Sequence, residues 1–136
     1  MSNMLEAVRL WLKSSPILKN DRIGIDYLSN EADSWAVAMS PTQPVVKKYI
    51  NGAYVGQFEF IIASRQQFGD DLNNNAQNIE VCEKLAEWLI SAPTLPNFGE
   101  EKDTQKCEIV SSGYISSANA QTARYEIRAK IIYIKH

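Results

Sequence analysis

The chain has 136 residues and a net charge of −2, and 45% of its residues are hydrophobic. This length suits one domain, residues 1–136, that buries roughly two-thirds of the surface of its unfolded chain. The composition argues against a disordered chain, and the slightly acidic balance argues against general attraction to nucleic acid or anionic lipid. Apolar runs stay well below the roughly 20 residues that span a bilayer, and the N-terminus lacks the pattern of a secretion signal. We therefore expect synthesis and folding in a cytoplasm.

The first predicted element is an amphipathic helix over residues 3–14. Its apolar residues recur at steps of three and four, namely Leu5, Val8, Trp11 and Leu12. Alternation of apolar and other residues then predicts a strand at 22–27 and a second strand at 34–39 that pairs back on it.

Residues 44–65 read as two strands joined across Asn51-Gly52, because both residues tolerate the positive φ of a tight hairpin turn. The adjacent lysines Lys47 and Lys48 cannot both point away from an apolar face unless the first strand lies at an edge or carries a bulge. Two interpretations of this pair stay open, a solvated edge strand or a contact between subunits.

A polar stretch at 66–78 predicts a loop, with Asn74 as the cap of a long helix over 75–91 and Gln77 three residues further on. The expected apolar stripe of that helix consists of Ile79, Cys82, Leu85, Ala86 and Leu89, packed on Phe58, Phe60 and Ile62. A long connection at 92–106 follows and contains the pair Glu100-Glu101, which we interpret as solvated carboxylates.

Two final strands are predicted at 107–117 and 123–135. In the second, one face is apolar and the other carries Arg124, Glu126, Arg128 and Lys130. Ile132 and Ile134 interrupt this charged face, which indicates either cover from the first helix or a buried subunit contact. The order α-β-β-β-β-α-β-β predicts an α+β fold, a mostly antiparallel sheet of about six strands with both helices on one face.

The sequence offers little for catalysis or cofactor binding. Its only histidine is His136, so Ser-His and Cys-His pairs and a zinc site are not expected, and Cys82 and Cys107 read as reduced, packed thiols. Glycine-rich phosphate loops are absent. Asp26, Glu59 and Glu126 could converge from strands, yet strand carboxylates more often face solvent. We expect no enzyme activity, no cofactor, no metal and no recognition of nucleic acid sequence.

Several landmarks in chain order carry a family resemblance over roughly residues 3–135. They are IGIDYLSNEADSWAV, VVKKYINGAYVGQFEFIIASR, QQFGDDLNNNAQN, LAEWLISAPTLPNFG and TARYEIRAKIIYI. In this order the chain resembles minor structural (minor capsid) proteins of phages and prophages of Gram-positive bacteria, which are similar to tail terminators. The resemblance implies a virion protein of the tail or neck that forms a ring, typically of six copies, on the tail tube. The resemblance also implies that the partners of this protein are tail-tube and head-connector proteins and that its role is to join head and tail.

A ring needs contact between two different patches of each subunit. The candidates for the subunit interface are Arg124, Glu126, Arg128, Lys130, Ile132, Ile134, Lys47 and Lys48. The candidates for contacts with tube or neck are loop residues Gln67, Asp70, Asp71, Asn97, Glu100 and Glu101. The alternative is a cytosolic dimeric α+β module that binds a small ligand in a pocket lined by Tyr54, Phe58, Phe60 and Trp88.

Overall fold

A computed structural model describes residues 4–18, 23–25, 34–40, 44–67, 72–118 and 122–136. The elements within these ranges are α1 (Met4–Lys13), β1 (Ile23–Ile25), β2 (Ser34–Met39), β3 (Val45–Lys48), β4 (Tyr54–Gln67), α2 (Leu72–Ser91), β5 (Lys102–Ala118) and β6 (Thr122–Lys135). The predicted order of elements and the α+β class are confirmed.

The strands form one six-stranded sheet in the order β1-β2-β4-β6-β5, and β3 pairs with β4 outside this path. Every pair is antiparallel except β1 with β2, which run parallel with Ile23 opposite Trp35. The expectation that the second strand folds back on the first was therefore wrong in direction. Alternation has the same period of two in both kinds of pair, so the pattern could not decide between them.

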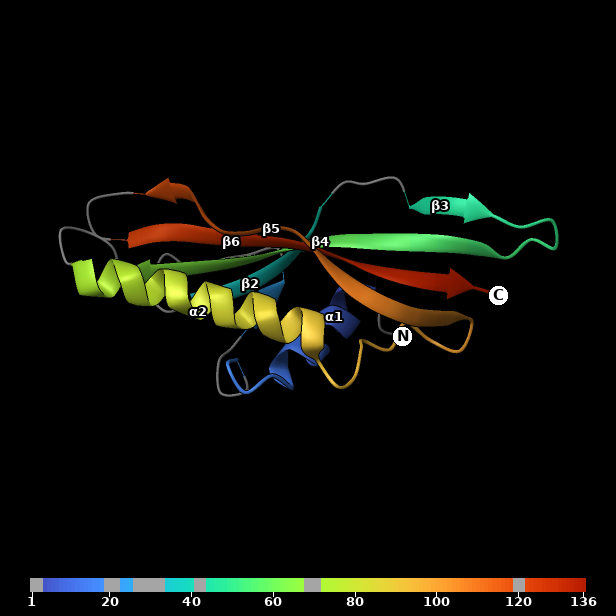
Figure 1. Ribbon diagram of the computed structural model, residues 1–136, viewed down its shortest axis with the longest axis horizontal. Helices are drawn as coiled ribbons and strands as arrows, with labels where there is room; N and C mark the ends of the chain where they lie inside the picture. Colours follow the sequence, from blue (N-terminus) through green and yellow to red (C-terminus); the bar gives the residue numbers. More distant parts are fainter. Residues whose placement is uncertain (1–3, 19–22, 26–33, 41–43, 68–71, 119–121) are drawn as a thin grey trace.

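Strands β4 and β6 form the long axis of the molecule (Figure 1). They pair without interruption from Tyr54 opposite Lys135 to Gln67 opposite Thr122. At about 3.3 Å per residue, this ladder is roughly 43 Å long. We call the end at Tyr54 and Lys135 the hairpin end and the opposite end the far end.

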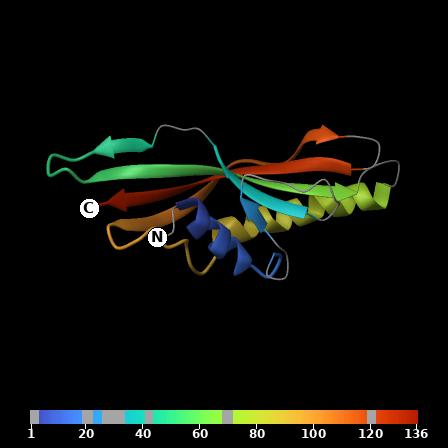
Figure 2. The ribbon, with the colours of Figure 1, turned by 180° about the vertical axis from the view of Figure 1, so that it is seen from behind.

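Both helices lie on the same face of the sheet (Figures 1 and 2). The alternation predicted for β6 is confirmed, because every second residue from Ala123 to Tyr133 is buried beneath them. The same core takes up Phe58, Phe60 and Ile62 from β4. Burial of these apolar side chains supplies the main stabilisation of the fold.

Helix α2 differs from the predicted long helix in its first residue, in which of its apolar residues are exposed, and in the strand on which it packs. It begins at Leu72, so Asn74 lies within the helix and is not its cap. Ile79 is exposed, whereas Cys82, Leu85 and Leu89 are buried. The helix lies mainly against β5 and only marginally against β4. Tertiary burial of the C-terminal half sustains a helix whose polar first turns read locally as a loop.

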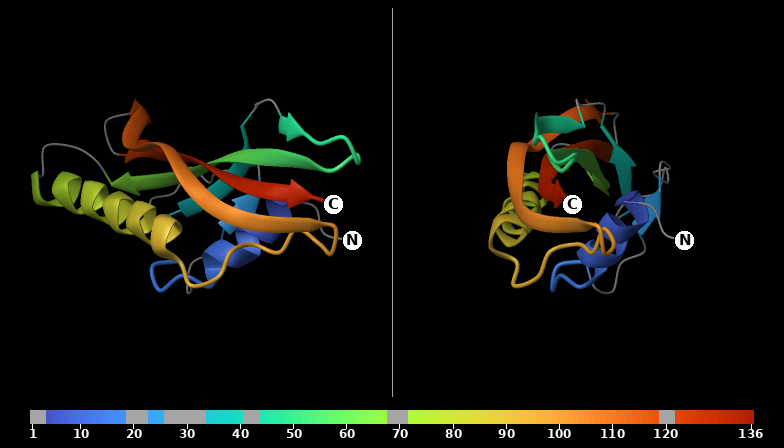
Figure 3. Two further views of the ribbon diagram at one scale, coloured as in Figure 1. Left: turned by 45° about the vertical axis from the view of Figure 1, so that its right-hand side comes forward. Right: turned by 90° about the vertical axis from the view of Figure 1, so that its right-hand side faces the viewer.

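Strand β5 begins at Lys102, so the preceding connection is shorter than expected. Its first residues are polar and lie at a sheet edge, where no apolar alternation marks a strand. The register against β6 shifts at four places, and the strand curls around the sheet (Figure 3). Such bulges protect a long edge strand against pairing with another chain.

The hairpin between β3 and β4 is present, but its loop is longer than the predicted turn. The N–H of Gly52 donates to the carbonyl of Tyr49 at 3.1 Å, and the N–H of Tyr49 donates to the carbonyl of Ala53 at 2.8 Å. Ile50, Asn51 and Gly52 therefore form a three-residue loop in which Gly52 has φ 92°. Gly52 meets the expectation of a positive φ.

Candidate interaction surface at the hairpin end

The hairpin of β3, its loop and the start of β4 projects from the body of the sheet (Figure 1). We call residues 45–54 the arm. Three apolar side chains of the arm face solvent: Val46 is 57% exposed, Tyr49 44%, and Ile50 fully. Exposed apolar side chains gathered on one projection are typical of a contact surface.

The lysines of the arm share this surface. Lys47 and Lys48 are both exposed, because the register of β3 shifts between Val45 and Lys47 and β3 lies at an edge. Both conditions predicted for this pair are therefore met. The ammonium of Lys47 lies 5.3 Å from the ring centre of Tyr49, and neither lysine has an ion pair with a described residue. The arm thus presents two uncompensated positive charges beside apolar side chains.

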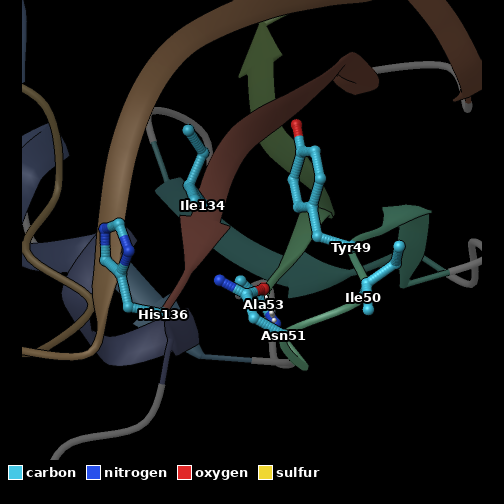
Figure 4. Close-up of a pocket in the computed structure, with 6 residues that line it drawn as sticks. All are labelled: Tyr49, Ile50, Asn51, Ala53, Ile134 and His136. Atoms are coloured by element: carbon cyan, nitrogen blue, oxygen red, sulfur yellow. Dashed lines mark hydrogen bonds between the residues drawn. The ribbon is translucent and has the colours of Figure 1, made fainter.

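An open hollow of about 640 Å³ lies between the arm and the end of β6 (Figure 4). Its lining residues are Tyr49, Ile50, Asn51, Ala53, Ile134 and His136. The wall is largely apolar, and Ile134 from β6 is brought beside the arm. The hollow gives the hairpin end a concave surface next to its convex arm.

An ion pair and a histidine–carboxylate hydrogen bond hold the C-terminal end of β6 in place behind the hollow. Lys135 Nζ lies 2.8 Å from Glu101 Oε2, and His136 Nε2 lies 2.6 Å from Asp103 Oδ2. The hydrogen bond and charge of Lys135 lower the pKa of Glu101. The backbone N–H of His136 also donates to the carbonyl of Glu101 at 3.0 Å. The chain before β5 is thereby tied to the end of β6.

An aromatic cluster lies at the base of the arm. Tyr133 contacts Tyr54 and Phe98 edge-on, with ring centres 6.4 Å and 5.7 Å apart, and Phe98 meets Phe58 at 5.9 Å. Gly56 packs against the ring of Tyr133 so closely that an added Cβ would lie 2.6 Å from its hydroxyl oxygen. The absent side chain of Gly56 is therefore what lets β4 and β6 pair beneath this ring.

The charged residues predicted on β6 are neutralised within the chain. Arg124 pairs with Glu126 at 2.8 Å, Arg128 with Glu59 at 2.9 Å, and Lys130 with Glu108 at 3.8 Å. These groups line the sheet face opposite the helices. Because their charges are paired internally, they offer a partner little net charge.

Glu59 is the most enclosed member of this face. The hydroxyl of Ser40 donates to its carboxylate at 2.5 Å, and Arg128 donates to both Ser40 and Glu59. The Nε of Arg128 is buried without a partner. Glu59 and Glu126 each pair with their own arginine and do not converge, and Asp26 lies outside the described residues.

The two isoleucines of β6 lack the cover from the first helix that one of the two sequence interpretations expected. Ile132 and Ile134 are half-buried. Helix α1 lies on the opposite face against β1 and β2, so it does not cover them. Ile134 lines the hollow, which makes it part of the hairpin end and leaves a subunit contact open.

The loop candidates that the structure describes fall at opposite ends of the sheet. Gln67 ends β4 at the far end, and Asp70 and Asp71 lie outside the described residues. Glu100 and Glu101 lie at the hairpin end, directly before Lys102, which is opposite Lys135. Asn97 is exposed, and its side chain accepts a hydrogen bond from the N–H of Gly99. The described candidates therefore do not form a single contact surface.

The sequence analysis missed the exposed apolar residues of the arm. Val46, Tyr49 and Ile50 counted as ordinary strand residues, yet an isoleucine inside a hairpin loop has no sheet face to occupy. The position of Ile50 directly before the Asn51-Gly52 turn could therefore have indicated an exposed apolar residue.

The aromatic residues proposed as a pocket lining belong to the core or to its margin. Phe58 and Phe60 are buried and stack at 6.3 Å, and Trp88 packs on Trp11 at 5.0 Å. Cys82 and Cys107 are buried free thiols, and burial raises their pKa to about 11 and about 12. In the described part of the chain, no group of three or more Cys, His, Asp or Glu side chains is placed to hold a metal ion.

Comparison with models of known protein families gave no match, and comparison with curated protein sequences gave none either. Among the helices within the described ranges, none has the length and apolar character required to cross a membrane.

Proposed function

We propose that the chain is a non-enzymatic structural subunit of a phage or prophage particle. In this role it caps the tail tube as a tail-terminator ring and joins the tail to the head connector. Two things support the proposal: the family resemblance of the sequence, and the projecting arm with its exposed Tyr49 and Ile50. The exposed arm is the observation that carries it.

The shape of the subunit suits a joint between two structures. The ladder of β4 and β6 separates the hairpin end from the far end by roughly 43 Å. One subunit therefore offers separate surfaces to two partners, such as a tube on one side and a connector on the other. The described loop candidates fit this division, because Gln67 lies at the far end and Glu100 and Glu101 lie at the hairpin end.

The chemistry of the described side chains supports a role without catalysis. The two thiols are buried and their pKa values are raised, whereas a nucleophilic cysteine needs a lowered pKa and access to substrate. The strand carboxylates Glu59 and Glu126 are engaged by arginines. Such paired groups stabilise a surface and leave no reactive acid–base pair between them.

The proposal is tested by mixing the purified protein with tail tubes assembled from a purified phage tail-tube protein. Electron microscopy should show a ring at one end of each tube, and tube length should stop increasing when the protein is present. Tubes that grow unchanged and carry no added density would contradict the proposal. Discovery of a bound small ligand in a stable dimer would instead favour the ligand-binding alternative.

A further inference from the structure

The outer flank of α2 carries unpaired acids between exposed apolar residues. Ile79 is 43% exposed and Ile90 is 65% exposed, and Glu83 and Glu87 are exposed between them. At 100° per residue these four side chains lie within an arc of about 80°, along roughly 16 Å of helix. We call them the α2 stripe. It lies beside the buried face of α2.

The acids of the α2 stripe lack internal compensation. Glu83 and Glu87 have no ion pair with any described residue, whereas the neighbouring Glu80 pairs with Lys84 at 3.1 Å. The same contrast holds for the arm, whose Lys47 and Lys48 are unpaired while the charges on β6 are paired. Among the described residues, Lys47 and Lys48 thus lack a counter-charge on one surface, and Glu83 and Glu87 lack one on another.

The arm and the α2 stripe match in size and chemistry. From Val46 to Ile50 the arm spans about 13 Å in an extended chain, close to the length of the stripe. Each surface combines exposed apolar side chains with two like charges, and the two signs are opposite. Complementary charge of this kind selects one partner surface and fixes its register.

We propose that the arm of one copy docks on the α2 stripe of a second copy. In this contact Val46 packs against Ile79, Tyr49 and Ile50 pack against Ile90, and the lysines between them face Glu83 and Glu87. The two patches differ, so the contact is head-to-tail and repeats from copy to copy until the ring closes. The inference rests on the proposed ring and specifies which surfaces form it. The bulged edge of β5 is unsuited to the alternative of strand-to-strand pairing.

Charge reversal tests the contact without touching the core. Reversing both lysines of the arm, Lys47→Glu with Lys48→Glu, should weaken self-association at least tenfold in sedimentation velocity. Reversing the stripe, Glu83→Lys with Glu87→Lys, should do the same. All four changes in one chain should restore association. The control, Lys13→Glu with Lys106→Glu, makes the same change of net charge outside both surfaces. It removes one exposed ion pair, between Lys106 and Glu108, and should leave association unchanged.

A disulfide test locates the contact directly. Ile50→Cys and Ile90→Cys chains should form a mixed disulfide when they are combined under oxidising conditions. The native thiols of Cys82 and Cys107 should not compete in this reaction, because they are buried. Ile50→Cys mixed with Val110→Cys, which places a thiol on exposed β5, should form none. If the parent forms rings but charge reversal leaves them intact and no Ile50–Ile90 link appears, the docking inference is wrong and the proposed function stands. A parent that remains monomeric overturns the docking inference, and its capping of tubes is then decided separately by microscopy.

Discussion

Replacing Gly56 by alanine tests how the arm is joined to the sheet. The added Cβ would lie 2.6 Å from the hydroxyl oxygen and from Cε2 of Tyr133, roughly 0.8 Å inside ordinary van der Waals contact. The ring has little room to move, because Tyr133 is only 2% exposed and is flanked by Phe98 and Tyr54. We expect the free energy of unfolding to fall by about 1–3 kcal/mol, the usual cost of overpacking a core.

Urea unfolding followed by tryptophan fluorescence measures this cost. The midpoint should fall while the slope m stays the same, because the substitution alters stability and not the surface exposed on unfolding. In a Tyr133→Leu background the same Gly56→Ala change should cost less than about 0.5 kcal/mol, since the clash is gone. Equal costs in the two backgrounds would refute the reasoning.

Gly52→Ala provides the matched control. Gly52 has φ 92° and no atom within 4 Å of an added Cβ, so its substitution strains the backbone without a clash. The Gly52→Ala change should lower the free energy of unfolding by about 1–2 kcal/mol. This cost should be the same in the parent chain and in the Tyr133→Leu background.

Two further predictions concern the core. Burial raises the pKa values of the Cys82 and Cys107 thiols from 9.0 to about 11 and about 12. The contribution of each buried thiol to the free energy of unfolding is therefore fully present below pH 9. This contribution declines as pH rises above 9, by up to about 1.4 kcal/mol per pH unit for each thiol, and a Cys82→Ala/Cys107→Ala chain should lack that part of the slope. Equal pH profiles in chemical denaturation would contradict this cause. Trp11→Phe removes the hydrogen bond from the indole N–H to the carbonyl of Thr94 at 2.7 Å and should cost about 1–2 kcal/mol in thermal unfolding, whereas an unchanged midpoint would show that this bond is not needed.

The sequence predicted most reliably the elements whose burial repeats regularly. Strand β6 alternates strictly and lies at the centre of the sheet, so pattern and environment agree from Ala123 to Tyr133. Helix α1 follows for the same reason. The polar start of α2, around Asn74, and the first residues of β5 escaped prediction because tertiary contacts, not local preference, determine them.

The candidate surface was predictable only in part. Lys47 and Lys48 were identified because two adjacent lysines conflict with a strand period of two. The hollow beside Ile134 depends on the register of β4 against β6, which brings the arm to the end of β6. The pairing of Arg128 with Glu59 depends on the same register. Register is a property of the folded sheet, so no local pattern could reveal these two groupings.

The most direct measurement is the mass of the assembled protein in solution, by native mass spectrometry at increasing concentration. If the chain is a ring subunit that works through its outer surfaces, one discrete assembly of more than two copies should accumulate, and Lys47→Glu with Lys48→Glu should convert it to monomers. A stable two-fold dimer, or a monomer at every concentration, would contradict a head-to-tail ring built by this chain alone.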